Sequence, residues 1–390
     1  MSTSSKPLIA FIGQKGISNV TGGVETHVRE LSFRVAEKGF PVIVYARPYT
    51  TSKDEEMIGG VRVKRLPSLR TKHLDTITHT LLATLHAVWI GADIFHFQSI
   101  GPSLLAFVPR LFRPHARVMV TFHSIDREHG KWGRFAKWVL RCAEWTALTF
   151  PHVTITTSET NAAYARRTYN KDAIVIPTGV VRPVSRPAQK ITEQFGLCAN
   201  EYILIASRLI PHKNIHLVIE AFKQIQTDVT LAIAGDASYT DSYEASLRAL
   251  SDGDDRIVFC GRQDGEMLEE LFSNCLFYVN MSNSEGCPTA TLEAMSYGKP
   301  VLVSSIPVNH EIAATAGTYA LRNVQSIVQK LREMLARHDV LMARSPEIQE
   351  ETLARFDWQT VVEKTTNVYL GLRYCKDANR AVQFMMPEKR

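Results

Sequence analysis

The chain has 390 residues, of which 45% are hydrophobic and 22% are charged, and its formal net charge is +6. This length can bury two cores of ordinary size, and the composition excludes a chain that is largely disordered or fibrous. The apolar segment Leu8–Ile12 is too short for the core of a signal peptide. The segment Leu81–Ala92 is too short to span a membrane and is predicted to be a buried helix.

The cysteines exclude two kinds of small scaffold. All six are widely spaced, without a C-x-x-C pair and without histidines at ligand spacing, so neither structural zinc nor a disulfide framework is expected. Reduced cysteines are typical of the cytoplasm, and we therefore expect a cytoplasmic protein. The six are Cys142, Cys198, Cys260, Cys275, Cys287 and Cys375.

The first half of the chain alternates apolar strands with helices. Leu8–Ile12 is predicted to be the first strand, and a glycine-bearing loop follows at 13–23. Val24–Lys38 has apolar residues at helical spacing, and Gly39 ends it. Apolar strands separated by helices predict a parallel sheet that is covered on both faces. The further strands predicted are Pro41–Tyr45, Ile94–Phe97, Arg117–Phe122, Val153–Thr157 and Ala173–Ile176.

The same alternation begins again after a loop-like segment at 177–187. We expect an N-terminal Rossmann-like domain on the acceptor side at 1–180, a linker at 181–200 and a second Rossmann-like domain at 201–355. We expect residues 356–390 to form a C-terminal helix and tail, with the helix crossing back to the first domain. Two doubly wound domains favour a ligand in the cleft between them. The strands predicted here are Tyr202–Ala206, Val229–Ala234, Arg256–Phe259, Leu276–Asn280 and Val301–Ser304.

Three loops carry the residues that suit a phosphorylated ligand. The first runs from Gly13 to Glu25 and contains Gly22 and Gly23 directly before a helix, whose free N–H groups suit phosphate. Its alternative is a plain tight turn. The dinucleotide fingerprint G-x-G-x-x-G and the P-loop are both absent, which disfavours a nicotinamide dehydrogenase.

The second loop, 207–214, lies between the first strand and first helix of the second half. Arg208 could hold a diphosphate with its two-pronged guanidinium, and Lys213 with its point charge. The alternative is a solvated basic loop. Ligands bind at the carboxyl ends of strands in open α/β sheets, which favours a functional role.

The third loop gives the strongest pattern. Glu285 lies in the loop and Glu293 about one turn into the helix that follows, so their carboxylates can address different hydroxyls of one ligand. The helix N-terminus between them offers N–H groups to phosphate. The alternative is that the two acids are unrelated. Glu285 would then only interact with the helix dipole, and Glu293 would be an exposed acid on the helix.

These motifs occur in one order: Gly22-Gly23-Val24-Glu25, the Arg208/Lys213 pair, and the E-x7-E segment with its continuation Glu293–Val301. Together they resemble the family-4 (GT4) retaining glycosyltransferases of the GT-B fold, over roughly Leu8 to Leu370. The resemblance implies an α/β fold of two Rossmann-like domains facing across a cleft. It also implies transfer of a sugar from a UDP- or GDP-sugar to a glycan or lipid-linked acceptor, in bacterial surface polysaccharide or glycolipid synthesis, with no cofactor.

The resemblance also implies roles for single residues. Arg208 and Lys213 neutralise the leaving diphosphate, Glu293 holds the ribose hydroxyls, and Glu285 with the backbone after it holds the sugar. His123 lies at the sugar end of the cleft; a structural histidine is its alternative. The implied catalytic residues are His123, Arg208, Lys213 and Glu285. The implied donor-binding residues are Gly22, Gly23, Arg208, Lys213, Asp236, Arg262, Glu285, Gly286, Cys287, Thr289, Ala290 and Glu293.

Three features near these motifs limit the chemistry. Pro288 stands where many family members have glycine and lacks an N–H, which affects the sugar contacts at that point. No nearby feature activates Cys287 as a nucleophile. The spelling D-x-D at Asp252-Gly253-Asp254 precedes a strand and is predicted to be a turn, so no metal site is expected.

Two other classes share parts of this pattern. A sugar-nucleotide epimerase would bind the same donor without an acceptor, and a phosphorylase would need a lysine for pyridoxal phosphate that no local pattern marks. A non-catalytic sugar-nucleotide-binding subunit is the alternative outside enzymes. The intact set of Arg208, Lys213, Glu285 and Glu293 argues against it.

The stretch Val108–Arg141 holds eight basic residues and two acidic ones, which equals the excess charge of the whole chain. Within it, Lys131–Arg141 has tryptophans beside lysines and arginines at helical spacing, which is typical of a helix at an anionic membrane surface. An ordinary domain helix is the alternative. No nucleic-acid-binding module accompanies the stretch, so a nucleic-acid partner is not expected. We expect peripheral binding at the inner face of the cell membrane.

Overall fold

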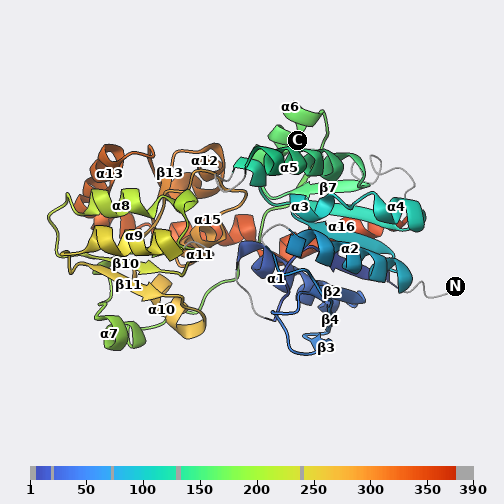
Figure 1. Cartoon of the computed structure of the whole chain (residues 1–390). Helices are drawn as coiled ribbons and strands as arrows, with labels where there is room; N and C mark the ends of the chain where they lie inside the picture. Colours follow the sequence, from blue (N-terminus) through green and yellow to red (C-terminus); the bar gives the residue numbers. More distant parts are fainter. Residues whose placement is uncertain (1–5, 19–21, 72–73, 129–132, 238–240, 375–390) are drawn as a thin grey trace. The chain divides into compact units, whose positions relative to one another are not determined.

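The computed structural model describes residues 6–18, 22–71, 74–128, 133–237 and 241–374. The chain divides into two compact units with boundaries at Gly179/Val180 and Asp357/Trp358, and the segment after Asp357 belongs to the N-terminal unit (Figure 1). Residues 181–200, expected to be a linker, lie in the C-terminal unit instead. There, α7 (Lys190–Phe195) contacts α10 (Gly265–Asn274) and buries Ile191.

The N-terminal unit is built on one sheet whose described strands run in the order β3-β4-β2-β1-β5-β6-β7-β8. All neighbours pair in parallel except β3 with β4, an antiparallel hairpin that the sequence patterns did not predict. The strands are β1 (Ile9–Ile12), β2 (Val42–Ala46), β3 (Glu55–Ile58), β4 (Val61–Arg65), β5 (Ile94–Gln98), β6 (Arg117–Phe122), β7 (Val153–Thr156) and β8 (Ile174–Val175).

Helices cover both faces of this sheet, because its central strands are apolar on both sides. In β1, Ile9 and Phe11 join the core under α1 (Gly23–Glu37) and α16 (Trp358–Tyr374), whereas Ala10 and Ile12 join the core on the other face. That second face is covered by α2 (Leu74–Trp89), α3 (Ile100–Ser103), α4 (Val108–Phe112), α5 (Arg134–Thr149) and α6 (Glu159–Tyr169).

The expectation of a buried helix over Leu81–Ala92 is wrong for its large side chains. Helix α2 points Ala83 and Ala87 into the core, while Leu85 is 44% exposed and Trp89 is 81% exposed. Small residues let α2 pack closely on the sheet and leave the bulky residues outside. No helix among the described residues is both long and apolar enough to cross a bilayer.

The C-terminal unit contains a fully parallel sheet in the order β11-β10-β9-β12-β13-β14 over the described strands. The sequence predicted each of these strands except β14. They are β9 (Tyr202–Ala206), β10 (Thr230–Ala234), β11 (Ile257–Gly261), β12 (Phe277–Asn280), β13 (Val301–Ser304) and β14 (Gly317–Ala320). The helices on its two faces are α7, α8 (Ile215–Phe222), α9 (Asp241–Ser251), α10, α11 (Thr289–Ser296), α12 (Pro307–Ala313), α13 (Val324–Ala336), α14 (His338–Met342) and α15 (Ser345–Phe356).

Candidate functional site

In the C-terminal unit, the loops predicted to bind the ligand follow β9, β10, β11 and β12. These strands are parallel neighbours, so their carboxyl ends lie along one edge of the sheet. The loops therefore gather there, although they are far apart in the sequence. We call this group of loops the C-terminal half-site; its polar residues come from 207–214, 235–236, 261–262 and 281–293.

An ion pair joins two of these loops. Lys213 Nζ lies 2.5 Å from Glu285 Oε1, and both side chains are largely buried, with 17% and 14% of their surface exposed. Burial alone would raise the pKa of the Glu285 carboxyl, but the adjacent Lys213 ammonium outweighs it and holds that pKa at about 2. Asn280 Nδ2 also donates to Glu285 Oε1 at 3.3 Å. Glu285 is therefore a fixed carboxylate over the physiological pH range.

Further hydrogen bonds hold the same two loops together. His212 Nε2 lies 2.7 Å from the Ser284 carbonyl oxygen, and Asn214 Nδ2 donates to the Met281 carbonyl oxygen at 2.8 Å. Asn214 adopts a left-handed backbone conformation at φ 52° between a 3-10 turn and α8. The sequence patterns did not single out His212 or Asn214. Both belong to the basic loop, and only the fold shows that they pair with the loop that follows β12.

Helix α11 begins at Thr289, directly after the Glu285 loop. Its N-cap residue is Pro288, whose side chain has no atom that can accept a hydrogen bond, so the first N–H groups of the helix remain uncapped. Such a helix end attracts anions. Gly286 in the preceding loop is buried, whereas Cys287, Thr289 and Ala290 are half-buried.

Glu293 lies in α11, one turn beyond this helix end, and is half-buried. Burial raises the pKa of its carboxyl to about 7, and the negative charge of Glu269 adds to the effect. The two carboxylates of the E-x7-E segment thus differ in charge behaviour: Glu285 stays ionised, while Glu293 exchanges its proton near neutral pH.

A close backbone contact aligns the loops that carry Arg208, Asp236 and Arg262. Gly235 has a φ of +151°, and a Cβ atom there would lie 1.8 Å from the Ser207 carbonyl oxygen, so only glycine fits. Around it, Leu209 N donates to the Asp236 carbonyl oxygen at 2.9 Å, and Gly235 N to the Gly261 carbonyl oxygen at 2.7 Å. The side chains of Arg208 and Arg262 are exposed at this edge.

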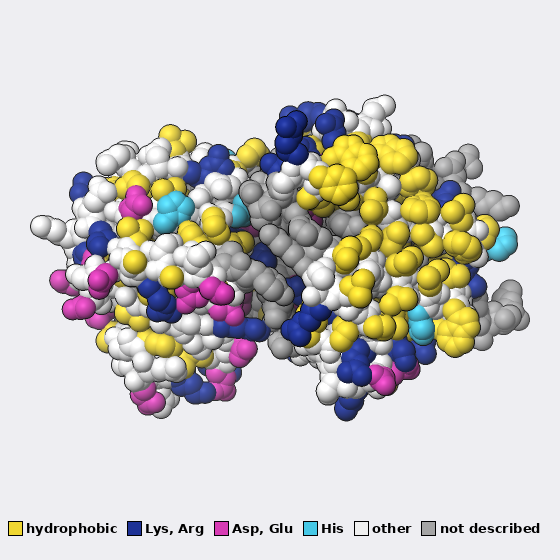
Figure 2. Space-filling view, viewed as in Figure 1, with side chains coloured by type: hydrophobic (Ala, Val, Ile, Leu, Met, Phe, Trp, Pro, Cys, Tyr) yellow, Lys and Arg dark blue, Asp and Glu magenta, His cyan; other side chains and the backbone are white. Residues whose placement is uncertain are grey.

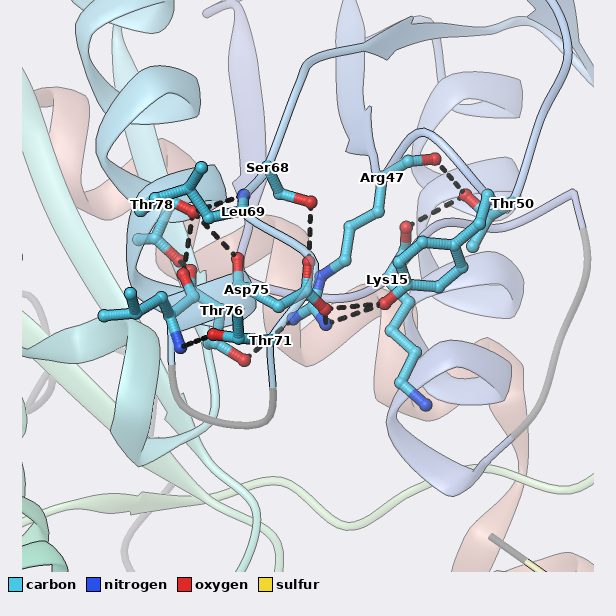
Figure 3. A network of polar contacts seen from close by, with 12 residues as sticks. Lys15, Arg47, Thr50, Ser68, Leu69, Thr71, Asp75, Thr76 and Thr78 are labelled. Atoms are coloured by element: carbon cyan, nitrogen blue, oxygen red, sulfur yellow. Dashed lines mark hydrogen bonds and ion pairs between the residues drawn. The ribbon is translucent and has the colours of Figure 1, made fainter. Parts of the chain in front are cut away.

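The N-terminal unit carries the rest of the predicted residues. Gly22 is the N-cap residue of α1. Because glycine has no side chain, it makes no side-chain hydrogen bond to the first N–H groups of the helix. Earlier in the chain, Lys15 is held by its neighbours: Arg47 N and Thr50 Oγ1 both donate to the Lys15 carbonyl oxygen, at 2.7 and 3.0 Å (Figure 3). Glu25 accepts from Lys15 N at 3.3 Å.

Arg47 also connects this loop to α2. Its guanidinium forms an ion pair of 2.6 Å with Asp75 in the first turn of α2, and Tyr49 and Ser68 donate to the same carboxylate (Figure 3). Each oxygen of Asp75 thus accepts from a neighbour, which fixes the start of α2 against the end of β2.

His123 follows β6 and is 8% exposed. Its Nε2 lies 2.9 Å from Gln98 Oε1, and its ring meets the ring of His27 edge-on with centroids 5.0 Å apart. Burial lowers the pKa of His123 well below its usual value, and the nearby His27 and His96 act in the same direction. His123 is therefore a neutral hydrogen-bonding group. The sequence patterns missed His27, although it lies in α1 four residues after Gly23.

The D-x-D motif at 252–254 forms a turn, as predicted. Asp254 accepts from Arg256 and forms an ion pair with it at 2.7 Å before β11, and Gly253 has a φ of +76°. Across the described part of the chain, no group of three or more His, Cys, Asp or Glu side chains could hold a metal ion.

Comparison with solved structures places both units in the GT-B fold. Sucrose-phosphate synthase from Thermosynechococcus elongatus aligns with a TM-score of 0.82 at 21% identity, over 94% of this chain and 99% of that one. The Anabaena protein HepE in complex with UDP-glucose aligns with a TM-score of 0.77 at 18% identity, over 92% and 98% of the two chains. At these identities the likeness establishes the fold.

Curated relatives match parts of the chain. The O-antigen chain mannosyltransferase RfbU of Salmonella typhimurium is 28% identical over 153 residues, which cover 35% of this chain and 43% of that protein. The N,N'-diacetylbacillosaminyl-diphospho-undecaprenol alpha-1,3-N-acetylgalactosaminyltransferase of Campylobacter jejuni is 22% identical over 56% of this chain and 60% of that protein. The chain thus spans less than two thirds of the length of either relative.

Two family models match the chain in succession and account for most of its length. The model described as Glycosyltransferase Family 4 matches residues 21–182, which hold Gly22, Gly23 and His123. The model described as Glycosyl transferases group 1 matches residues 189–346, which hold the whole C-terminal half-site. The chain therefore belongs to the glycosyltransferases that combine a Family 4 domain with a group 1 domain.

Proposed function

We propose that this protein transfers a sugar from a nucleotide-sugar to a glycan or lipid-linked acceptor with retention of the anomeric configuration. The observation that carries the proposal is the Lys213–Glu285 ion pair beside the uncapped start of α11. It places a cation, a fixed carboxylate and free N–H groups at one strand edge. A diphosphate and a sugar together need that combination of partners.

Each group has a distinct role in the proposed reaction. Negative charge develops on the diphosphate as the bond between the sugar carbon and the phosphate oxygen breaks. Arg208, Lys213 and the N–H groups at the start of α11 stabilise that charge. The acceptor oxygen forms the new bond to that carbon, and its proton passes to the leaving phosphate. Glu285 binds sugar hydroxyls without becoming a covalent nucleophile, since its carboxylate is already paired with Lys213.

The N-terminal unit and the nucleoside contacts complete the proposal. Gly22 and Gly23 allow the donor phosphates to approach the backbone, and His123 hydrogen-bonds the sugar as a neutral imidazole. Asp236 and Arg262 lie near the nucleoside, and Glu293 binds the ribose. The donor is a UDP- or GDP-sugar; the fold relative HepE holds UDP-glucose.

For the acceptor, we propose a glycan or a lipid-linked glycan of a bacterial surface polysaccharide, met at the inner face of the membrane. Two of the relatives, an O-antigen chain mannosyltransferase and an N-acetylgalactosaminyltransferase named for a diphospho-undecaprenol acceptor, support this class. None of the cysteines that the structure describes forms a disulfide, which supports a reducing compartment.

The function is tested first by donor binding and product analysis. UDP- and GDP-sugars are screened for thermal stabilisation, because a ligand that binds only the folded state raises the melting temperature. The stabilising donor is then incubated with and without an acceptor, and the fresh product is examined by NMR. We expect nucleotide release that depends on the acceptor and a retained anomeric centre. Conversion of the donor without an acceptor would instead identify an epimerase, and an inverted centre would exclude the retaining mechanism.

Glu285→Gln and Arg208→Ala should each lower turnover by about a hundredfold or more, because each removes a charge that acts on the reacting groups. Melting temperature should change much less for Arg208→Ala, whose side chain is exposed. Turnover and melting temperature are measured on the same preparations. Glu193→Gln, an exposed acid on α7, is the control. Near wild-type turnover in both variants would show that the site is wrongly assigned.

Glu293→Gln should stabilise the protein and weaken donor binding. The folded-state pKa of about 7 exceeds the ordinary value of 4.5, so the carboxylate opposes folding above pH 4.5 and does so fully above pH 7. The variant should therefore melt higher than wild type at pH 8, with the difference vanishing below pH 4.5. Donor affinity of the wild type should fall as pH drops through 7 and should be flat in the variant. Unchanged donor affinity would remove Glu293 from the ribose site.

Activity should not depend on a divalent metal. The cations Arg208 and Lys213 stand where the diphosphate is proposed to lie. The D-x-D, in contrast, precedes β11, at the opposite end of that strand from Arg262, and its Asp254 pairs with Arg256. Turnover is measured in EDTA and again after adding Mg²⁺ or Mn²⁺ in excess. We expect rates within a factor of about two across these conditions. Loss of activity in EDTA with recovery on metal addition contradicts the prediction.

A further inference from the structure

Large apolar side chains cover one outer surface of the N-terminal unit. Figure 2 shows them as a broad yellow area over α2, α4 and α5, with Lys and Arg side chains at its upper border. We call this surface the apolar face. Its members are each at least 38% exposed: Leu81, Leu82, Leu85 and Trp89 of α2, Leu111 and Phe112 of α4, and Phe135, Trp138 and Trp145 of α5.

The apolar face is one continuous layer. Helix α2 contacts α3 and α4, and α3 contacts α5, so the helices lie side by side on the same face of the sheet. Phe135 and Trp138 stack on one another with ring centroids 6.0 Å apart. Contiguous apolar surfaces of this kind on a monomer mark places where something else binds.

The distribution of residue sizes shows that the exposure is not a by-product of packing. In α2 the core positions are Ala83 and Ala87, and in α5 they include Ala143 and Ala147. An ordinary surface helix buries its large apolar residues and exposes small or polar ones. In α2 this order is reversed, and none of the outward leucines and tryptophans of α2 and α5 belongs to the buried cluster on this face of the sheet.

The exposed charges on α2, α4 and α5 have one sign. The three helices contain two acids, Asp75 and Glu144, and both are paired, with Arg47 and Arg127. Glu144 is fully buried and also accepts from the hydroxyls of two tyrosines of α6. The four basic residues of these helices are exposed: Arg110, Arg134, Lys137 and Arg141. The surface is therefore apolar and cationic together.

We propose that the apolar face docks on an anionic lipid bilayer, with the side chains of α2, α4 and α5 at the boundary between headgroups and acyl chains. Tryptophans beside basic residues suit that boundary. A protein partner would need acidic residues that complement the basic ones of the apolar face. Two copies of the chain that met through this face would bring basic residues against basic residues. The inference deepens the proposed lipid-linked acceptor, since it brings that acceptor's membrane to the N-terminal unit.

The inference reaches beyond the basic stretch that the sequence singled out. Lys131 and Trp132 of that stretch lie outside the described residues, whereas α2 contains no basic residue other than histidine. Binding through a basic helix alone is electrostatic and disappears in high salt. Insertion of α2 and α4 adds an apolar component that salt does not screen.

The test uses the full chain with vesicles and without donor or acceptor. Flotation is measured with vesicles of phosphatidylglycerol and phosphatidylcholine at low and high salt. Tryptophan quenching is followed with lipids brominated in their acyl chains. We expect flotation on the anionic vesicles, a part of it retained in high salt, and quenching that falls in Trp89→Phe. The buried Trp358, 4% exposed, should stay unquenched.

Leu85→Ser/Trp89→Ser should weaken vesicle binding by about tenfold or more, because two large apolar side chains no longer leave water. The matched control is Leu321→Ser, a leucine of the C-terminal unit that is 62% exposed. These positions are exposed, and circular dichroism checks that the fold is kept. Donor-induced thermal stabilisation is measured on the same variants and should be unchanged, which separates this inference from the proposed transfer reaction.

Three results would overturn the inference. The first is no flotation on anionic vesicles at low salt. The second is equal vesicle binding by Leu85→Ser/Trp89→Ser and Leu321→Ser. The third is a dimer in solution that dissociates in the double variant. The last result would assign the apolar face to a second copy of the chain.

Discussion

The C-terminal half-site depends on the ion pair between Lys213 and Glu285. Two ions removed from water are costly unless each finds a partner in good geometry, and here each is the other's partner. Because the two residues belong to loops that follow different strands, the pair also fixes the distance between those loops. His212 and Asn214 add neutral hydrogen bonds across the same junction. The protein's own side chains thus hold the two loops together at the sheet edge.

The same short segment holds two carboxyl groups in opposite states. Burial acts on both, but Glu285 has a cation at 2.5 Å while Glu293 has the negative Glu269 in its surroundings. One residue is consequently a permanent charge, and the other is poised to change its charge near pH 7. Environment rather than residue type separates their roles. A folded chain that keeps Glu293 half-buried without a cation gives up stability at the position where the donor is proposed to bind.

The sequence predicted the doubly wound architecture because its apolar strands are short, continuous and separated by helical periods. It also predicted the loops of the half-site, since parallel strands bring their carboxyl ends to one edge. It failed where tertiary context decides. The strands of the hairpin β3–β4 are short and half-polar, and the alternation in β4, where Val61 and Val63 are buried between polar residues, was overlooked in the sequence. Helix α2 was predicted to be buried from its apolar composition, but only its alanines face the core and its large apolar side chains are exposed. His27 and His212 gained their partners only through contacts between segments distant in the sequence.

Helix α16 gives the N-terminal unit a core that is discontinuous in the sequence. Trp358 and Tyr369 belong to the same buried cluster as Ile9 and Val28, and Tyr369 hydrogen-bonds His96 in β5 at 2.8 Å. The C-terminal unit, in contrast, is one uninterrupted stretch from Val180 to Asp357. During synthesis, the ribosome therefore releases the first 179 residues with one face of their sheet incompletely covered. The unit made second can close its core first, and the unit made first must wait for α16.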